Sequence, residues 1–143
     1  DSCPGVSSFC GAAAALNLEY TLAEVSHTVI ITRTEGRTPV PEREKIMSFA
    51  AHGATMVLFL STGLLEKLVK ELLAGGYASD TPAAIVYKAT WPEEEAYVET
   101  ARKHQITKTA LILVGNVVTH SHYERSKLYD PGFTTEFRKG SDS

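Results

Sequence analysis

Four short apolar segments are separated along the chain by loops rich in glycine, proline and small polar residues. The segments are 27–33 (HTVIITR), 55–60 (TMVLFL), 83–88 (AAIVYK) and 109–114 (TALILV). Runs of this length that are rich in β-branched residues are typical of β-strands. We therefore predict four strands, together with an edge strand and a few helical turns in the polar stretch that precedes the last of them.

Three segments between these strands have the composition or spacing of helices. The first is alanine-rich, has Ser7 or Ser8 as its capping residue and stops at Asn17. The second is short and covers residues 42–51. The third, residues 64–74, carries leucines on one face and charged residues on the other.

The alternation of strands and helices predicts an α/β fold, in which one domain has a mixed β-sheet of about four to five strands flanked by helices. We assign residues 1–118 to this domain and residues 119–143 to a C-terminal tail that packs on the domain or on a partner. The predicted strands stop at small residues, which leaves main-chain N–H and C=O groups available to a small molecule.

Composition narrows the possible partners. The 143 residues are 43% hydrophobic and carry a formal net charge of −3, which disfavours nucleic acid and anionic membrane as partners. There is no apolar run of transmembrane length and no signal peptide, so we expect a cytoplasmic protein. Cys3 and Cys10 are predicted to be reduced thiols, with a disulfide between them as the alternative.

Several longer runs resemble a known protein family. They are PGVSSFCGAAAALNLEYTLAEVSHTVIITRTEGRTPVPERE, GATMVLFLST, DTPAAIVYKATWP and KTALILVGNVV. All are similar to the C-terminal half of the tetrapyrrole methyltransferases. The GRTPVPE segment is similar to the branch that methylates C11 of cobalt-precorrin-4 in anaerobic cobalamin biosynthesis, and sibling enzymes act on other corrin carbons or on uroporphyrinogen. The resemblance implies the second domain of the tetrapyrrole methylase fold, without the N-terminal domain of the same enzyme.

The resemblance also implies the chemistry. Such an enzyme transfers a methyl group from S-adenosyl-L-methionine to cobalt-precorrin-4 or a related tetrapyrrole, releases S-adenosylhomocysteine, and forms a homodimer. Because the methyl sulfonium is already activated, catalysis depends on positioning, and no catalytic residue is expected. By resemblance, the cofactor-binding positions are Ser7, Ser8, Leu60, Tyr87, Ala89, Thr109 and Ala110.

Each of these positions also has an ordinary structural interpretation. Ser7 and Ser8 are suited to capping a helix, Leu60 to a core, and Ala89 to a strand end. The fragment alone is expected to be inactive. The alternative function is therefore an inactive folding or dimerisation module.

A basic loop provides a second candidate site. Arg33 and Arg37 are predicted to bind the acetate and propionate groups of the substrate, because guanidinium forks bind carboxylates bidentately. The alternative is a solvated loop in which they pair with Glu35, Glu42 and Glu44. No metal site is predicted, because His120 and His122 lack neighbouring carboxylates or thiols. Cobalt would arrive inside the substrate.

Overall fold

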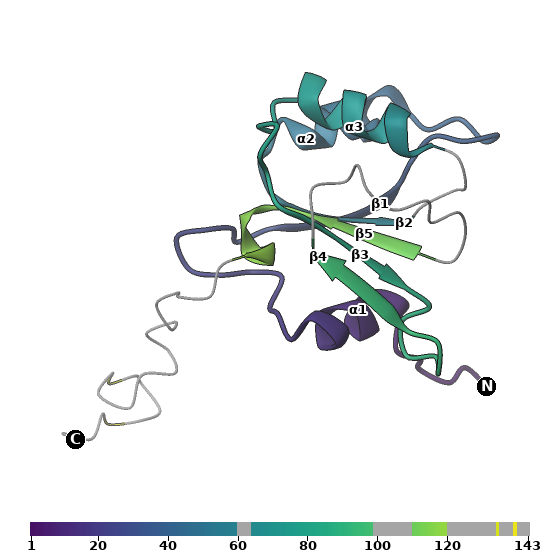
Figure 1. Cartoon of the computed structure of the whole chain (residues 1–143), viewed down its shortest axis with the longest axis vertical. Coiled ribbons are helices and arrows are strands. Elements are labelled where there is room, and N and C mark those ends of the chain that lie inside the picture. The colour runs from purple at the N-terminus through teal and green to yellow at the C-terminus, as the bar shows by residue number, and fades with distance from the viewer. Residues whose placement is uncertain (60–63, 99–109, 120–133, 135–138, 140–143) are drawn as a thin grey trace.

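A five-stranded mixed sheet forms the centre of the computed structural model (Figure 1). The structure describes residues 1–59, 64–98, 110–119, 134 and 139. The strand order is β1-β2-β5-β3-β4, in which β1 and β2 are parallel and the other neighbours are antiparallel. The strands are β1 (Val29–Arg33), β2 (Thr55–Phe59), β3 (Ala83–Tyr87), β4 (Glu95–Val98) and β5 (Ala110–Val114). The predicted mixed α/β fold is confirmed, and the polar stretch supplies the fifth, edge strand.

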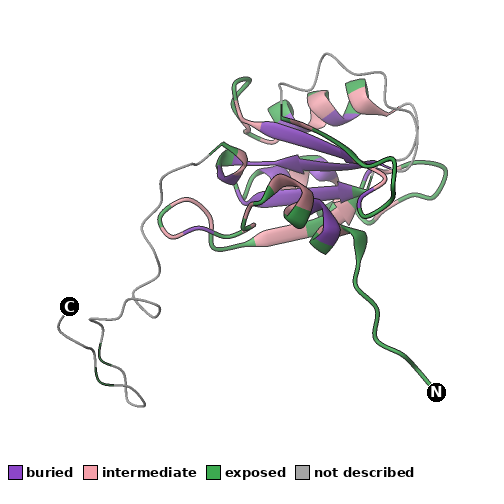
Figure 2. Ribbon diagram, turned by 60° about the horizontal axis from the view of Figure 1, so that its bottom comes forward, coloured by how far each residue is buried: buried purple, intermediate pink, exposed green. Residues whose placement is uncertain are grey.

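Helices cover the two faces of the sheet unequally (Figure 1). The helix α1 (Ser8–Leu16) lies on one face, whereas α2 (Ile46–Ala50) and α3 (Leu65–Ala74) lie on the other. Each face has its own hydrophobic cluster, and both clusters use alternate residues of the central strands. All five residues of β5 are buried, and Figure 2 shows the buried residues gathered in the middle of the sheet.

The predicted helix over residues 42–51 is interrupted. A 3₁₀ turn, η1 (Glu42–Glu44), is followed by Lys45 in an extended conformation, and α2 begins at the next residue. The interruption allows Ile46, which is 1% exposed, to enter the core while the charged residues of η1 stay at the surface. Burial of one isoleucine therefore outweighs continuation of a helix that is largely exposed.

The helix α3 keeps its predicted amphipathic pattern. Leu68 and Leu72 are buried in the core, and Lys67 lies 3.6 Å from Glu71 on the polar side. The helix stops at Gly75, and Gly76 follows with a φ of 112°. The predicted end of this helix at residue 74 is confirmed, as is the stop of α1 at Asn17, which is left-handed with a φ of 48°.

The two N-terminal cysteines are free and exposed. Within the described ranges, no helix is both long and apolar enough to cross a membrane. A second 3₁₀ turn, η2 (Asn116–Val118), closes the part assigned to the domain. The assignment of the following segment to a tail lies almost entirely outside the described residues and stays a prediction.

Two half-buried phenols connect distant parts of the chain. The Tyr20 hydroxyl donates a hydrogen bond to the Phe9 carbonyl at 2.5 Å, and the Tyr77 hydroxyl donates to the Ala54 carbonyl. Burial raises the pKa of both tyrosines from 10.0 to about 12. In the folded protein the neutral phenol is favoured, because a phenolate would lose its hydration and its ability to donate.

We therefore expect stability to fall in alkaline solution. The unfolded tyrosines lose their protons near pH 10 while the folded ones keep them to about pH 12, so the stabilisation is complete below about pH 10 and disappears as the pH rises through about 12. Urea unfolding between pH 8 and pH 11.5 should give a steeper loss of free energy for the unaltered chain than for Tyr20→Phe/Tyr77→Phe. Equal dependence of the unfolding free energy on pH in the two proteins would show that these tyrosines do not cause the alkaline loss of stability.

Candidate functional site at one edge of the sheet

The ends of all five strands lie together at one end of the sheet, where Glu95 of β4 also pairs with Tyr87 of β3. In the sheet register, Arg33 of β1 lies beside Phe59 of β2, Phe59 lies beside Leu111 of β5, and Ala110 of β5 lies beside Tyr87 of β3. The carboxyl ends of β1, β2 and β3 and the amino ends of β4 and β5 therefore share this end of the sheet, which we call the strand-end edge. Ligands of open α/β sheets commonly bind outside the carboxyl ends of strands.

The structure brings several predicted site residues to the strand-end edge. Tyr87 and Ala110 are direct cross-strand neighbours, and Ala89 follows two residues after the end of β3. Leu60 and Thr109 lie outside the described residues. In the sequence, Leu60 directly follows Phe59, and Thr109 directly precedes Ala110. Their predicted contacts therefore stay predictions.

The turn that follows β3 has an unusual backbone. Lys88 and Thr90 both have positive φ, 46° and 72°, on either side of Ala89. For a β-branched residue such as threonine this region is strongly disfavoured, and a strained residue of this kind costs about 1–3 kcal/mol. Such strain persists only where the surroundings hold it, and it is common at ligand sites. We call residues 88–90 the strained turn.

The strained turn leaves two main-chain groups without a partner among the described residues. The Trp91 N–H donates to the Lys88 carbonyl at 2.9 Å, and the Thr90 N–H donates to Glu94 Oε2 at 2.6 Å. Among the described residues, the main-chain N–H and C=O of Ala89 make no hydrogen bond, although the residue is only 9% exposed. Buried main-chain donors and acceptors normally find partners, so this N–H and this C=O are well suited to bind a ligand.

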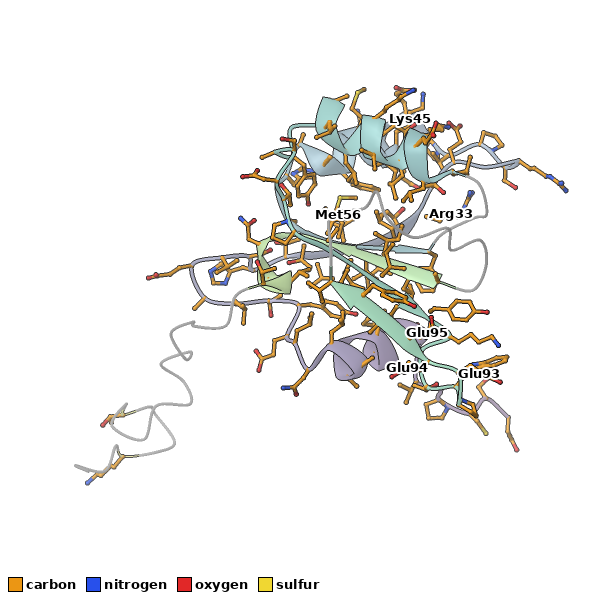
Figure 3. All side chains as sticks on the ribbon, in the orientation of Figure 1. Arg33, Lys45, Met56, Glu93, Glu94 and Glu95 are labelled. Atoms are coloured by element: carbon orange, nitrogen blue, oxygen red, sulfur yellow. The ribbon has the colours of Figure 1, made fainter. Side chains whose placement is uncertain are left out.

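Charged and aromatic side chains surround the strained turn. The Lys88 ammonium lies 5.4 Å from the ring centroids of both Tyr87 and Trp91, and 3.5 Å from Glu93 Oε2. Figure 3 shows Glu93, Glu94 and Glu95 grouped at the connection between β3 and β4, on the same side of the molecule as Arg33. Sequence analysis did not identify Glu94, because an acidic residue in a polar loop gives no signal of its backbone partner.

The helix α1 packs against the strained turn. A Cβ atom built on Gly11 would lie 2.6 Å from the Thr90 Cγ2 and 3.5 Å from the Ala89 Cβ. The glycine in this alanine-rich helix therefore marks a close approach, and it is the signal that sequence analysis missed. Ser7 and Ser8 lie about one helical turn before this contact.

The two serines occupy the start of α1 as predicted. Ser7 is the N-cap residue and Ser8 the first helical residue, and both are exposed. However, the Ser7 side chain makes no capping hydrogen bond. Neither serine donates to or accepts from another described side chain, so both hydroxyls remain available to a ligand.

The two arginines of the basic loop, Arg33 and Arg37, are both exposed and form no ion pair with Glu35, Glu42 or Glu44. Arg33 donates from Nη1 to the carbonyl oxygens of Thr34 and Thr38, at 3.3 and 3.4 Å, and Arg37 forms no ion pair with a described residue. The carboxylates pair with lysines instead, in Lys45–Glu42 at 2.6 Å and Lys67–Glu35 at 3.6 Å. Across the described ranges, no cluster of three His, Cys, Asp or Glu residues suits a metal ion.

Comparison with known proteins identifies the family. The family model for Tetrapyrrole (Corrin/Porphyrin) Methylases matches residues 1–104, and the chain belongs to this family. It is 50% identical over 143 residues to the Cobalt-precorrin-4 C(11)-methyltransferase of Methanocaldococcus jannaschii. The alignment covers 95% of this chain and 55% of that protein. It is 47% identical over 150 residues to the enzyme of the same name from Priestia megaterium, covering 98% and 58%.

A comparison with solved structures points to the same family. The X-ray structure of a cobalamin biosynthetic enzyme, the cobalt precorrin-4 methyltransferase CbiF, superposes with a TM-score of 0.76 at 46% identity, covering 80% of this chain and 51% of that one. The mixed five-stranded sheet with flanking helices matches the tetrapyrrole methylase fold. The chain spans about half the length of the curated relatives that it matches.

Proposed function

We propose that this chain is the C-terminal half of an S-adenosyl-L-methionine-dependent enzyme that methylates C11 of cobalt-precorrin-4 in anaerobic cobalamin biosynthesis. Two relatives with this named activity, at 50% and 47% identity, support the choice of substrate and of methylated carbon. The observation that carries the proposal is the pair of main-chain groups of Ala89, its N–H and C=O, which have no described partner and are held by a strained turn at the strand-end edge.

In this proposal the strand-end edge forms one wall of the cofactor cleft. The Ala89 N–H and C=O bind the cofactor, Tyr87 and Ala110 border it, and Ser7 and Ser8 contact it from the start of α1. Leu60 and Thr109 are proposed to complete the wall. Polar groups that are already fixed in place lose little freedom when the ligand binds, and alignment of the methyl donor with its acceptor is worth up to about 7–11 kcal/mol.

We further propose that the missing N-terminal domain supplies the opposite wall, and that the complete enzyme is a cytoplasmic homodimer. The exposed apolar surface of α3 supports such a contact. Leu73 is 44% exposed, and a recess of about 490 Å³ lies beside it between α3 and β3. A surface of this kind is commonly covered by another domain or subunit.

Titration of the 143-residue chain with S-adenosylhomocysteine by calorimetry tests the proposal. We expect saturable binding that Glu94→Ala weakens about 5- to 10-fold, because loss of one hydrogen bond to the strained turn costs about 1–1.5 kcal/mol. Glu94→Gln should retain most of the affinity, since its amide oxygen still accepts from the Thr90 N–H. Glu66→Ala, an exposed acid on α3, is the matched charge control.

The outcomes separate the two functional interpretations. Flat heats for the unaltered chain would contradict a preformed half-site and favour an inactive folding or dimerisation module. Equal losses for Glu94→Ala and Glu66→Ala would show that net charge, rather than the geometry of the turn, controls the affinity. Turnover of cobalt-precorrin-4 by the chain joined to a first domain then tests the reaction itself.

A further inference from the structure

A recess of about 380 Å³ lies beside β1, between this edge strand and the loop over residues 39–41. Its walls include Ile31, Arg33, Phe59 and Glu44. We call it the β1 recess. Its volume is at the lower end of the range for small-molecule pockets, so it can hold one ring with its substituents but no large macrocycle.

The floor of the β1 recess is apolar and unusually exposed. Ile31 and Phe59 are 46% and 38% exposed, although both belong to strands. Their neighbours Ile30 and Leu58 point to the opposite face and join the cluster that includes residues of α2 and α3. On the face of Ile31 and Phe59, the helix α1 makes its main strand contact with the central strand β5, and these two side chains stay partly exposed.

The β1 recess also presents an exposed cation that two hydrogen bonds hold in place. Arg33 lies directly opposite Phe59 in the parallel register, at the strand-end edge. Its Nη1 is anchored by the Thr34 and Thr38 carbonyls, whereas its other N–H groups have no described partner. An arginine has five N–H donors, so an anchored guanidinium can still form a bidentate contact with a carboxylate.

One acidic group opposes this cation. Glu44 lines the same recess and forms no ion pair with any residue in the described part of the chain. A carboxylate at this position repels an anion and lowers its affinity, by an amount that solvent screening limits. Removing Arg33 should therefore lower the affinity for an anionic ligand, whereas neutralising Glu44 should raise it. The opposite signs of these two changes provide a test.

We infer that the β1 recess binds one carboxylate-bearing pyrrole ring at the edge of the substrate macrocycle. The ring lies on Ile31 and Phe59, and its acetate or propionate group binds the free N–H groups of Arg33. Glu44 disfavours a second carboxylate and so selects which edge of the macrocycle enters. The substrate class in this inference rests on the proposed function. The position of the binding site follows instead from the exposed apolar floor of the recess and from the Arg33 guanidinium.

Fluorescence titration of the 143-residue chain with uroporphyrin III, a carboxylate-rimmed porphyrin, tests the inference. We expect Arg33→Ala to weaken binding about tenfold and Arg33→Lys to weaken it less, because lysine keeps the charge but loses the fork. Glu44→Gln should strengthen binding about threefold, which corresponds to removal of one partly screened repulsion. Ile31→Thr, which preserves strand propensity, should weaken it about threefold through loss of apolar contact.

Arg43→Ala is the matched control, because Arg43 is an exposed arginine on η1 outside the walls of the recess. Equal weakening by Arg33→Ala and Arg43→Ala, or no strengthening by Glu44→Gln, would overturn the inference. Absence of uroporphyrin binding while S-adenosylhomocysteine still binds would also overturn it. That last result would leave the proposed cofactor site intact, so the two failures are distinguishable.

Discussion

Replacing Gly75 with alanine is expected to lower the free energy of unfolding by about 3 kcal/mol, the upper end of the usual cost of overpacking. A Cβ atom at this position would lie 2.4 Å from the Ala50 Cβ and 2.6 Å from the Met47 carbonyl oxygen. The backbone of Gly75 is helical, with φ −81° and ψ −6°, so alanine is conformationally allowed. The penalty is therefore one of space, because α3 ends directly against α2.

Urea unfolding of the variant measures this penalty. Gly36→Ala is the matched control, since a Cβ there meets nothing within 4 Å, and its stability should change by less than about 0.5 kcal/mol. If Gly75→Ala and Gly36→Ala have the same small effect, the two helices are not packed as closely as the structure shows. A large effect of both would point to the unfolded state instead.

The strands were predictable from local composition. A run such as the five residues of β5 is apolar throughout, and a strand of this kind is stable only where both faces are covered. Asn17 and Gly76 were likewise predictable as helix stops, because both adopt positive φ that most residues avoid. These features depend on each residue's own conformational preferences.

The features that form the candidate site were not predictable in this way. The strained turn requires positive φ at Lys88 and Thr90, which neither residue favours, and only packing and the Glu94 hydrogen bond hold it. The charge pairs of the basic loop also differed from the simplest expectation. Glu35 reaches Lys67 across a large sequence separation and leaves Arg33 to the loop carbonyls. Partners set by tertiary contacts have no local signature.

The second large effect is expected at the contact between α1 and the strained turn. Alanine normally stabilises a helix interior relative to glycine by about 0.5–1 kcal/mol. At Gly11, however, the added Cβ would lie 2.6 Å from the Thr90 Cγ2, and the β-branched side chain of Thr90 has little freedom to move away. We therefore expect Gly11→Ala to destabilise the protein by about 2 kcal/mol, the opposite of its intrinsic effect.

A double-mutant cycle with Thr90→Ser isolates this contact, because serine lacks the methyl group that causes the overlap. In the Thr90→Ser background, Gly11→Ala should instead stabilise the protein by about 0.5–1 kcal/mol, which gives a coupling of about 2.5–3 kcal/mol. Urea unfolding of the four proteins measures the cycle. Equal effects of Gly11→Ala in both backgrounds would contradict the contact.

The same cycle connects packing to the proposed function. If the Ala89 N–H and C=O bind the cofactor, an alanine side chain at position 11 that displaces the strained turn should weaken S-adenosylhomocysteine binding about tenfold, corresponding to about one lost hydrogen bond. Thr90→Ser should then restore the affinity together with the stability. Recovery of stability without recovery of affinity would show that α1 supports the fold of this edge but not the geometry of its ligand site. Parallel recovery supports one shared cause, because the Gly11 contact reaches the ligand site only through the position of the turn.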